Sequence, residues 1–173
     1  MPKTPTVTYI NRFTVMGLSV RTINRDEFNQ KTAKLPTLWE NFSSKGIADQ
    51  VINRVPHSPI FGVYSDYESD ATGYYTVTAG VTVEKEEEER IEWNTIHIPS
   101  GHYLVFENNS MLPQAVVETW KNVWHYFESQ NTYQRNFNAD FEVYRGAEDF
   151  ALYIGIKTGQ NGVILSEGSK DLL

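Results

Sequence analysis

The sequence predicts an α+β fold, in which duplicated β-α-β-β units form one antiparallel sheet with two long helices and a central pocket. Three observations lead to this prediction. Short segments recur in the same order in both halves of the chain, two stretches repeat apolar residues at helical spacing, and other apolar stretches alternate as strands do. A chain of 173 residues can bury a core of its own, so we expect residues 1–173 to form a single domain.

Three pairs of short segments carry the internal repeat. The clearest pair, 61–64 and 141–144, agrees at three of four positions. The other pairs are 38–42 with 123–127 and 75–81 with 150–156. Their common order predicts repeats over about 7–83 and 94–157, joined by an acidic connector at 84–92 and followed by a C-terminal tail at 158–173.

The first repeat is expected to contain four strands and one helix. The helix ends near Ser44, and Pro36 either starts its regular part or kinks it. Its buried stripe would consist of Leu35, Leu38, Trp39 and Phe42. The strands are expected near 7–11, 13–22, 60–66 and 73–83.

The second repeat gives the same pattern with clearer signals. Pro113 suits the first position of a helix, and apolar residues then follow at helical spacing. These residues are Val116, Trp120, Val123, Trp124 and Phe127. Strand-like runs lie at 95–98 and 102–106, separated by a turn at 99–101, and two more lie near 140–145 and 149–157.

Composition excludes several classes of function. The absence of cysteine rules out disulfides, thiolate zinc sites and thiol nucleophiles, and the four histidines show no metal spacing, so we expect no metal and no cofactor. The net charge of -7 comes with no basic stripe, so we expect no direct nucleic-acid binding. No apolar run is long enough for a membrane span, and the N-terminus lacks the apolar core of a secretory signal. We therefore expect a cytoplasmic protein with no membrane contact.

The two repeats differ at one position that could carry a functional side chain. The first has Gly62 where the second has Glu142. Strand alternation places Glu142 and Tyr144 on one face and Phe141 with Val143 on the other. A glycine opposite the acid would leave room for it. The alternative is that Glu142 faces water or pairs with a nearby arginine, Arg145.

Aromatic residues make up 13% of the chain, an unusual density. Those expected around Glu142 are Tyr64, Tyr75, Tyr144 and Phe150 from strands, with Trp39, Trp120 and Trp124 from helices. A carboxylate in an apolar cavity is costly, and a cationic guest supplies the missing counter-charge. Aromatic faces add cation–π attraction of roughly 0.5–2 kcal/mol each. The combination favours lipophilic, cationic aromatic compounds as ligands.

Segments 97–106 and 141–144, together with the tryptophan-bearing helix, resemble the GyrI-like (gyrase-inhibitor-like) effector-binding domain. This domain, with its GyrI/SOUL-like units, is the ligand domain of AraC-type and MerR-type multidrug regulators and also occurs alone. The resemblance covers about 7–157 and implies a central pocket for small, often cationic and aromatic molecules. It places the ligand's charge partner at Glu142.

The same resemblance implies roles for other aromatic residues. Tyr144 would lie beside the acid, and Phe150 would be the aromatic of the last strand. The counterpart of Phe150 in the first repeat would be Tyr75 or, one register away, Tyr74.

We therefore expect a stand-alone effector-binding protein for lipophilic cationic compounds. Ten residues or fewer precede the first expected strand, so we expect no helix-turn-helix and no operator binding. One alternative is a hydrolase of small electrophilic compounds that uses Glu142 as general acid or base. Another is a protein-binding module of gyrase-inhibitor type, acting through the acids from Glu86 to Glu89 on a protein partner, or forming a homodimer.

Overall fold

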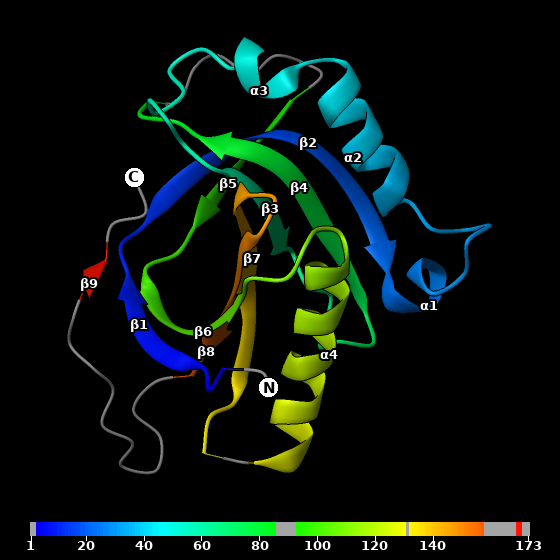
Figure 1. Cartoon of the computed structure of the whole chain (residues 1–173), viewed down its shortest axis with the longest axis vertical. Coiled ribbons are helices and arrows are strands. Elements are labelled where there is room, and N and C mark those ends of the chain that lie inside the picture. The colour runs from blue at the N-terminus through cyan, green and yellow to red at the C-terminus, as the bar shows by residue number, and fades with distance from the viewer. Residues whose placement is uncertain (1–2, 86–92, 131, 158–168, 171–173) are drawn as a thin grey trace.

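The computed structural model describes residues 3–85, 93–130, 132–157 and 169–170 (Figure 1). The first half contains β1 (Thr6–Ile10), β2 (Phe13–Ile23), α1 (Asn24–Glu27), α2 (Leu35–Ser44), α3 (Ile47–Gln50), β3 (Ile60–Ser65) and β4 (Tyr74–Thr82). The second half contains β5 (Asn94–Ile98), β6 (Gly101–Asn108), α4 (Gln114–Ser129), β7 (Arg135–Gly146) and β8 (Asp149–Ile156), followed by the short β9 (Ser169–Lys170).

All the strands belong to one sheet, in the order β5-β2-β4-β3-β7-β8-β6-β1-β9. Neighbouring strands are antiparallel, except for β9, which runs parallel to β1. The two repeats meet at the centre, where β3 pairs with β7. The expected α+β fold with a duplicated β-α-β-β unit is confirmed.

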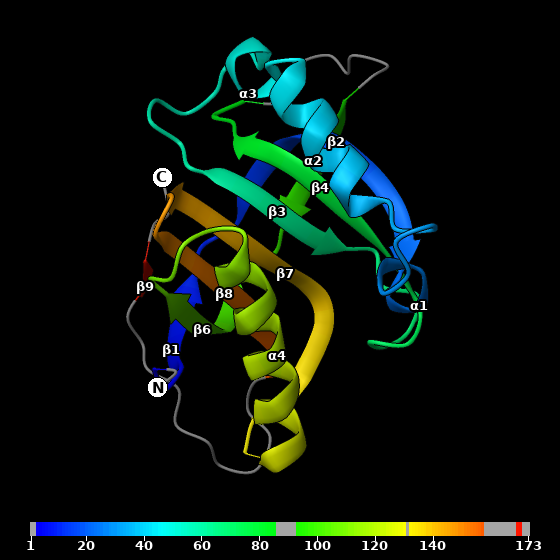
Figure 2. The same ribbon diagram turned by 45° about the vertical axis from the view of Figure 1, so that its right-hand side comes forward.

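The first strand of each half pairs with the other half, which the sequence did not indicate. β1 pairs with β6, and β5 pairs with β2, so the strands on either side of the 99–101 turn do not pair with each other. Ile10 lies opposite Gly101, and Phe13 lies opposite Ile98. The chain therefore crosses between the two ends of the sheet at two corners, and the sheet curls (Figures 1 and 2).

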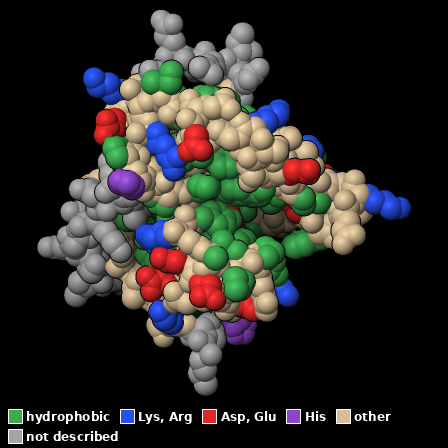
Figure 3. Space-filling model, turned by 45° about the horizontal axis from the view of Figure 1, so that its top comes forward, with side chains coloured by type: hydrophobic (Ala, Val, Ile, Leu, Met, Phe, Trp, Pro, Cys, Tyr) green, Lys and Arg blue, Asp and Glu red, His purple; other side chains and the backbone are tan. Residues whose placement is uncertain are grey.

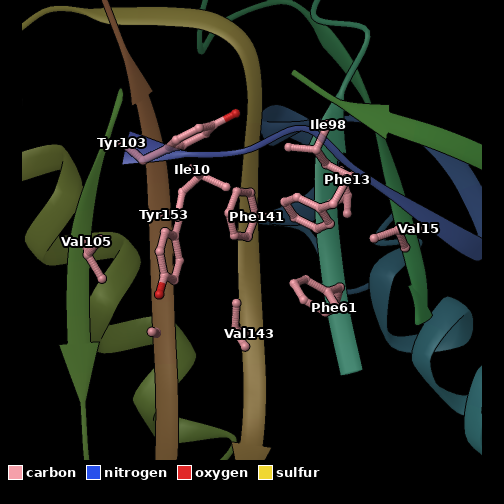
Figure 4. Packing of buried hydrophobic residues seen from close by; sticks show 12 residues of the cluster. Ile10, Phe13, Val15, Phe61, Ile98, Tyr103, Val105, Phe141, Val143 and Tyr153 are labelled. Carbon is pink, nitrogen blue, oxygen red and sulfur yellow. The ribbon is translucent and has the colours of Figure 1, made fainter. Parts of the chain in front are cut away.

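The inner surface of the curled sheet is filled by side chains. Its cluster of buried residues draws on both ends of the sheet and on the centre (Figure 4). Phe141 stacks on Tyr153 with ring centroids 4.6 Å apart, and its edge-on neighbours include Phe13 and Tyr103. Rings packed this closely leave no room for a ligand on the inner surface of the sheet, so a ligand site must lie on its outer surface.

Helices α2 and α4 lie against the outer surface of the sheet (Figure 2). In α2 the buried residues are Leu38 and Phe42, and Pro36 stands in the first turn, where its missing N–H costs no helical hydrogen bond. In α4 the fully buried residues are Ala115, Thr119 and Val123, with Pro113 just before the helix. Both expected helices are confirmed.

Some expectations differ from the structure or fall outside it. The strand expected near 140–145 begins earlier, at Arg135, and an irregularity between Arg135 and Asp140 interrupts the alternation that would have indicated this start. The short helices α1 and α3 were not expected. Of the acidic connector, 86–92 lies outside the described residues, and so does most of the C-terminal tail, including 158–168. Among the helices that the structure describes, none has the length and apolar character that crossing a membrane requires.

Candidate functional site

A cavity of about 360 Å³ lies on the outer surface of the sheet, between α4 and the segment around α1. Residues of both halves line it, and its aromatic lining consists of Phe28, Tyr64, Tyr67, Tyr75, Trp120 and Trp124. In Figure 3, hydrophobic side chains gather in a hollow, and acidic and basic side chains lie around it. A cavity of this size and lining is typical of a small-molecule site.

Glu142 lies beneath this aromatic lining, in the middle of β7. Its side chain is almost fully buried, with 1% exposed. Three groups donate hydrogen bonds to the carboxylate: Trp120 Nε1 at 2.8 Å, Tyr64 OH at 3.2 Å and Tyr144 OH at 2.8 Å. The expectation that Glu142 faces water or pairs with Arg145 is therefore excluded, and Arg145 lies 3.9 Å from Asp149 instead.

The strand pattern explains why these groups meet. Glu142 and Tyr144 are two residues apart on β7 and share the face that carries the helices, whereas Phe141 and Val143 face the inner core. On the neighbouring strand, Gly62 lies directly opposite Glu142. A side chain at position 62 would collide with the Glu142 carboxylate and would approach Trp39 Cζ2 to 3.0 Å. Because Gly62 has no side chain, the space opposite it is free, and the Glu142 side chain occupies that space.

The electrostatic environment of Glu142 is unusual for a buried acid. Burial raises the pKa of Glu142, and the three hydrogen bonds oppose this rise only in part. Burial next to Glu142 also raises the pKa values of Tyr64 and Tyr144 far above those of free phenols, so both remain hydrogen-bond donors at neutral pH. All three donors to the carboxylate are neutral, and among the described residues no cationic side chain forms an ion pair with it.

Asp140, two residues earlier on the same face, shows the contrast. It is also fully buried, but Arg135 Nη2 lies 2.7 Å from its Oδ2. Tyr67 OH donates to the same oxygen at 2.5 Å, and the backbone N–H of Gly155 donates to Oδ1 at 2.9 Å. Asp140 is therefore neutralised within the protein, whereas Glu142 is not.

The predicted site residues divide into three groups. Tyr64, Tyr75, Trp120 and Trp124 line the cavity. Glu142 and Tyr144 lie behind this lining, and Trp39 packs edge-on against Tyr144 at 5.2 Å. Phe150 belongs to the buried core, where it contacts Tyr144, and Tyr74 is 37% exposed beside the cavity residue Tyr75. Of the two registers considered, Tyr75 is the one that reaches the cavity.

Trp120 separates Glu142 from the cavity. Its indole both lines the cavity and donates to the carboxylate, and its ring lies 4.9 Å from that of Tyr64. Glu142 itself does not contribute to the lining. In this conformation the acid is closed off, and a ligand that contacts it must displace the indole.

Several residues of the site were not predicted from the sequence, and four of them bear on its chemistry. Asp140 could have been found, because it shares the face of Glu142 by simple alternation. Arg135 and Tyr67 reach the cavity through an irregularity and a loop, which leave no periodic signal. Phe28, 72% exposed, follows α1 and contacts Trp124 edge-on at 5.9 Å, which joins the two halves at the cavity.

A family model described as Cass2, integron-associated effector binding protein, matches residues 6–156. The chain belongs to this family. A crystal structure of the integron cassette protein Cass2 from the mobile metagenome of Vibrio cholerae is 33% identical, with a TM-score of 0.79 over 90% of this chain and 97% of that one. The predicted likeness to GyrI-like effector-binding domains is thus confirmed at the level of the Cass2 family.

Two further proteins are similar to this Cass2 family member. YobU of Bacillus subtilis (strain 168), whose name describes it as a candidate transcriptional regulator, is 27% identical over 139 residues, which is 80% of this chain and 84% of YobU. SAV2435, solved with tetraphenylphosphonium bound, is 16% identical, with a TM-score of 0.71 over 90% of this chain and 95% of that one. At that identity the likeness to SAV2435 concerns the fold.

Two alternative functions were considered from the sequence. The acids from Glu86 to Glu89, considered as a protein-binding surface, lie outside the described residues. General acid or base catalysis by Glu142 stays a prediction, and it faces the same condition as ligand binding, since Trp120 covers the carboxylate.

Proposed function

We propose that this effector-binding protein takes up lipophilic aromatic cations and that Glu142 is the charge partner of the bound cation. One observation carries the proposal: a buried carboxylate that is bonded only to neutral donors, directly beneath an aromatic cavity. A buried negative charge without a counter-ion costs free energy, and a cation that enters its surroundings recovers that cost.

The cavity lining suits such a guest. Tyr64, Trp120 and Trp124 present ring faces or edges to it, and flat cations gain both stacking and cation–π attraction from these rings. A neutral guest gains the stacking alone. The site therefore favours cations through charge and accepts different shapes through its rings.

Binding at Glu142 requires Trp120 to move. The cation replaces the indole N–H as a partner of Oε2, while Tyr144 holds Oε1 from the other side. Because a charge-to-charge contact is stronger than a neutral hydrogen bond at the same buried oxygen, the exchange favours a cation over a neutral molecule of equal shape. The fold relative SAV2435 supports the choice of ligand class, since tetraphenylphosphonium is a permanent lipophilic cation.

The test uses two ligands of nearly the same shape, 10-methylacridinium and acridine, at a pH at which acridine is neutral. Their dissociation constants are measured by calorimetry for the wild type and for Glu142→Gln. We expect the substitution to weaken 10-methylacridinium binding about tenfold or more and to change acridine binding less than about twofold. Equal losses for the two ligands would contradict the proposal, because the acid would then have no role in selecting charge.

A further inference from the structure

We propose that the cavity selects a monocation that carries a neutral hydrogen-bond acceptor at its far end, and that Arg135 donates to this acceptor. This inference rests on the proposed function, because the cationic end of the ligand is the one at Glu142. It adds a second recognition point and narrows the ligand class from lipophilic cations in general to cations with a carbonyl, ester or similar acceptor.

Arg135 is placed at the cavity and is largely enclosed. It belongs to the cavity lining, and only 9% of its side chain is exposed. Its guanidinium carbon lies over the Phe137 ring, 4.3 Å from the ring centre, and this cation–π contact helps to hold the group in place. A guanidinium held in this way is a pre-organised donor and not a mobile surface charge.

The guanidinium has unused donors. An arginine carries five N–H groups, and the hydrogen bonds to Asp140 and to Tyr67 are both formed by Nη2. Nε is buried and has no hydrogen-bond partner among the described residues. Nη1 also forms no hydrogen bond among the described residues, so an acceptor that a ligand brings to this guanidinium would be bound in preference to an apolar group.

The backbone is distorted at the point that places Arg135. The pairing of β7 with β8 is interrupted between Arg135 and Asp140, and Phe137 has a positive φ of 53°. A bulky residue in the left-handed region is strained, and such strain gathers where a side chain must be aimed in a particular direction. Here the irregularity lets Arg135 fold back onto Asp140 and face the cavity.

The distance between the two recognition points suits one small molecule. Arg135 is hydrogen-bonded to Asp140, and the Cα atoms of Asp140 and Glu142, two residues apart on the same strand face, are separated by about 7 Å. The rings of Tyr64, Tyr75 and Tyr67 form a continuous wall between them, with centroid separations of 5.6 Å and 5.9 Å. An aromatic ring with substituents at opposite ends spans this wall from Glu142 to Arg135.

The charges favour a neutral acceptor over a carboxylate. Arg135 is already balanced by Asp140, and the other charged residues that line the cavity are Glu27 and Lys121. With Glu142 ionised, these five side chains carry one net negative charge, which a monocation balances. A zwitterion would leave that charge uncompensated, so the group at Arg135 is expected to be polar and uncharged.

The test compares two probes that differ only in the acceptor: 4-acetylphenyltrimethylammonium and 4-isopropylphenyltrimethylammonium. The quantity measured is the ratio of their dissociation constants on the same protein sample, so that a loss of folded protein affects both values equally. We expect the preference for the acetyl probe over the isopropyl probe to be about fivefold to tenfold stronger in the wild type than in Arg135→Met/Asp140→Asn. That double substitution removes both members of the pair, so neither charge is left unpaired.

A matched control exists on the same hairpin. Arg145 and Asp149 form a more exposed pair outside the cavity lining, so Arg145→Met/Asp149→Asn is expected to keep the wild-type ratio. If the Arg135 double variant does not fold, Arg135→Lys keeps a partner for Asp140, and we expect it to lower the ratio too. A ratio that is the same in the wild type and in the Arg135 variants would overturn the inference alone. If neither probe binds the wild type, both the inference and the proposed function are contradicted.

Discussion

Glu142 lies directly opposite Gly62 in the β3–β7 pair, and these two residues occupy equivalent positions in the two repeats. The approximate twofold axis of the fold therefore passes between them. A symmetric pair of acids here would place two carboxylates side by side, and a symmetric pair of glycines would provide no charge. The difference between the repeats produces one buried acid and the space that it needs.

Gly62→Ala is predicted to lower stability, because the added methyl group collides with the Glu142 carboxylate and crowds Trp39. Overpacking of this kind costs about 1–3 kcal/mol in the free energy of unfolding, which urea denaturation measures. Gly146→Ala is the matched control, since a Cβ at that position meets nothing within 4 Å. Equal stability of the two variants would show that the space opposite Glu142 is not tightly filled.

The sequence was sufficient for the elements whose residues repeat with a clear period. The stripe of Trp120, Val123 and Phe127 predicted α4, and alternation predicted that Glu142 and Tyr144 share one face of β7. The comparison of the repeats then indicated Gly62 and Glu142, because a mismatch stands out only against an otherwise similar pair.

Other features depend on contacts that no local pattern records. The exchange of β1 and β5 between the halves is decided by which edges meet in space, so a turn at 99–101 did not reveal it. The position of Arg135 depends on the positive φ of Phe137, which breaks the alternation of β7. Trp120 was expected near Glu142, but the hydrogen bond that its indole donates to the carboxylate was not predicted, because helix register relative to a sheet depends on packing.

The stability of the protein is predicted to depend on the pH through Glu142. Its folded-state pKa lies above the ordinary value of 4.5, so the folded protein holds this proton more tightly than the unfolded chain does. The unfolding free energy therefore falls as the pH rises from 4.5 through the folded-state pKa, and it stays lower above that pKa. Urea denaturation of the wild type and of Glu142→Gln over a pH series measures this. The wild type should lose stability relative to the variant as the pH rises, and a constant difference would be inconsistent with a raised pKa.

Trp120→Phe is predicted to move the pH dependence of cation binding to higher pH. The indole N–H lowers the pKa of Glu142, so its removal raises that pKa, and the carboxylate becomes available only at higher pH. Calorimetric titration with 10-methylacridinium over a pH series gives the midpoint. Trp124→Phe is the control, because Trp124 lines the same cavity and contacts Phe28 and Trp120 but is not among the donors to Glu142. A midpoint that shifts equally in both variants would contradict a specific role of the indole N–H.

Phe28→Ala is predicted to weaken binding of aromatic cations without loss of stability. Phe28 is 72% exposed and touches Trp124 across the cavity, so its ring contributes to ligand contact more than to the core. An aromatic contact of this kind corresponds to about threefold to tenfold in the dissociation constant, measured by tryptophan fluorescence. Met111→Ala, at a similarly exposed residue outside the cavity lining, should leave binding unchanged. A loss of thermal stability with no loss of affinity would instead assign Phe28 to the fold.

A crystal structure of the complex with 10-methylacridinium tests the central claim most directly. The account predicts that the charged ring lies against the Glu142 carboxylate and that Trp120 Nε1 has left the position in which it donates to Oε2. A ligand bound elsewhere in the cavity, with the hydrogen bond from Trp120 to Glu142 intact, would contradict it.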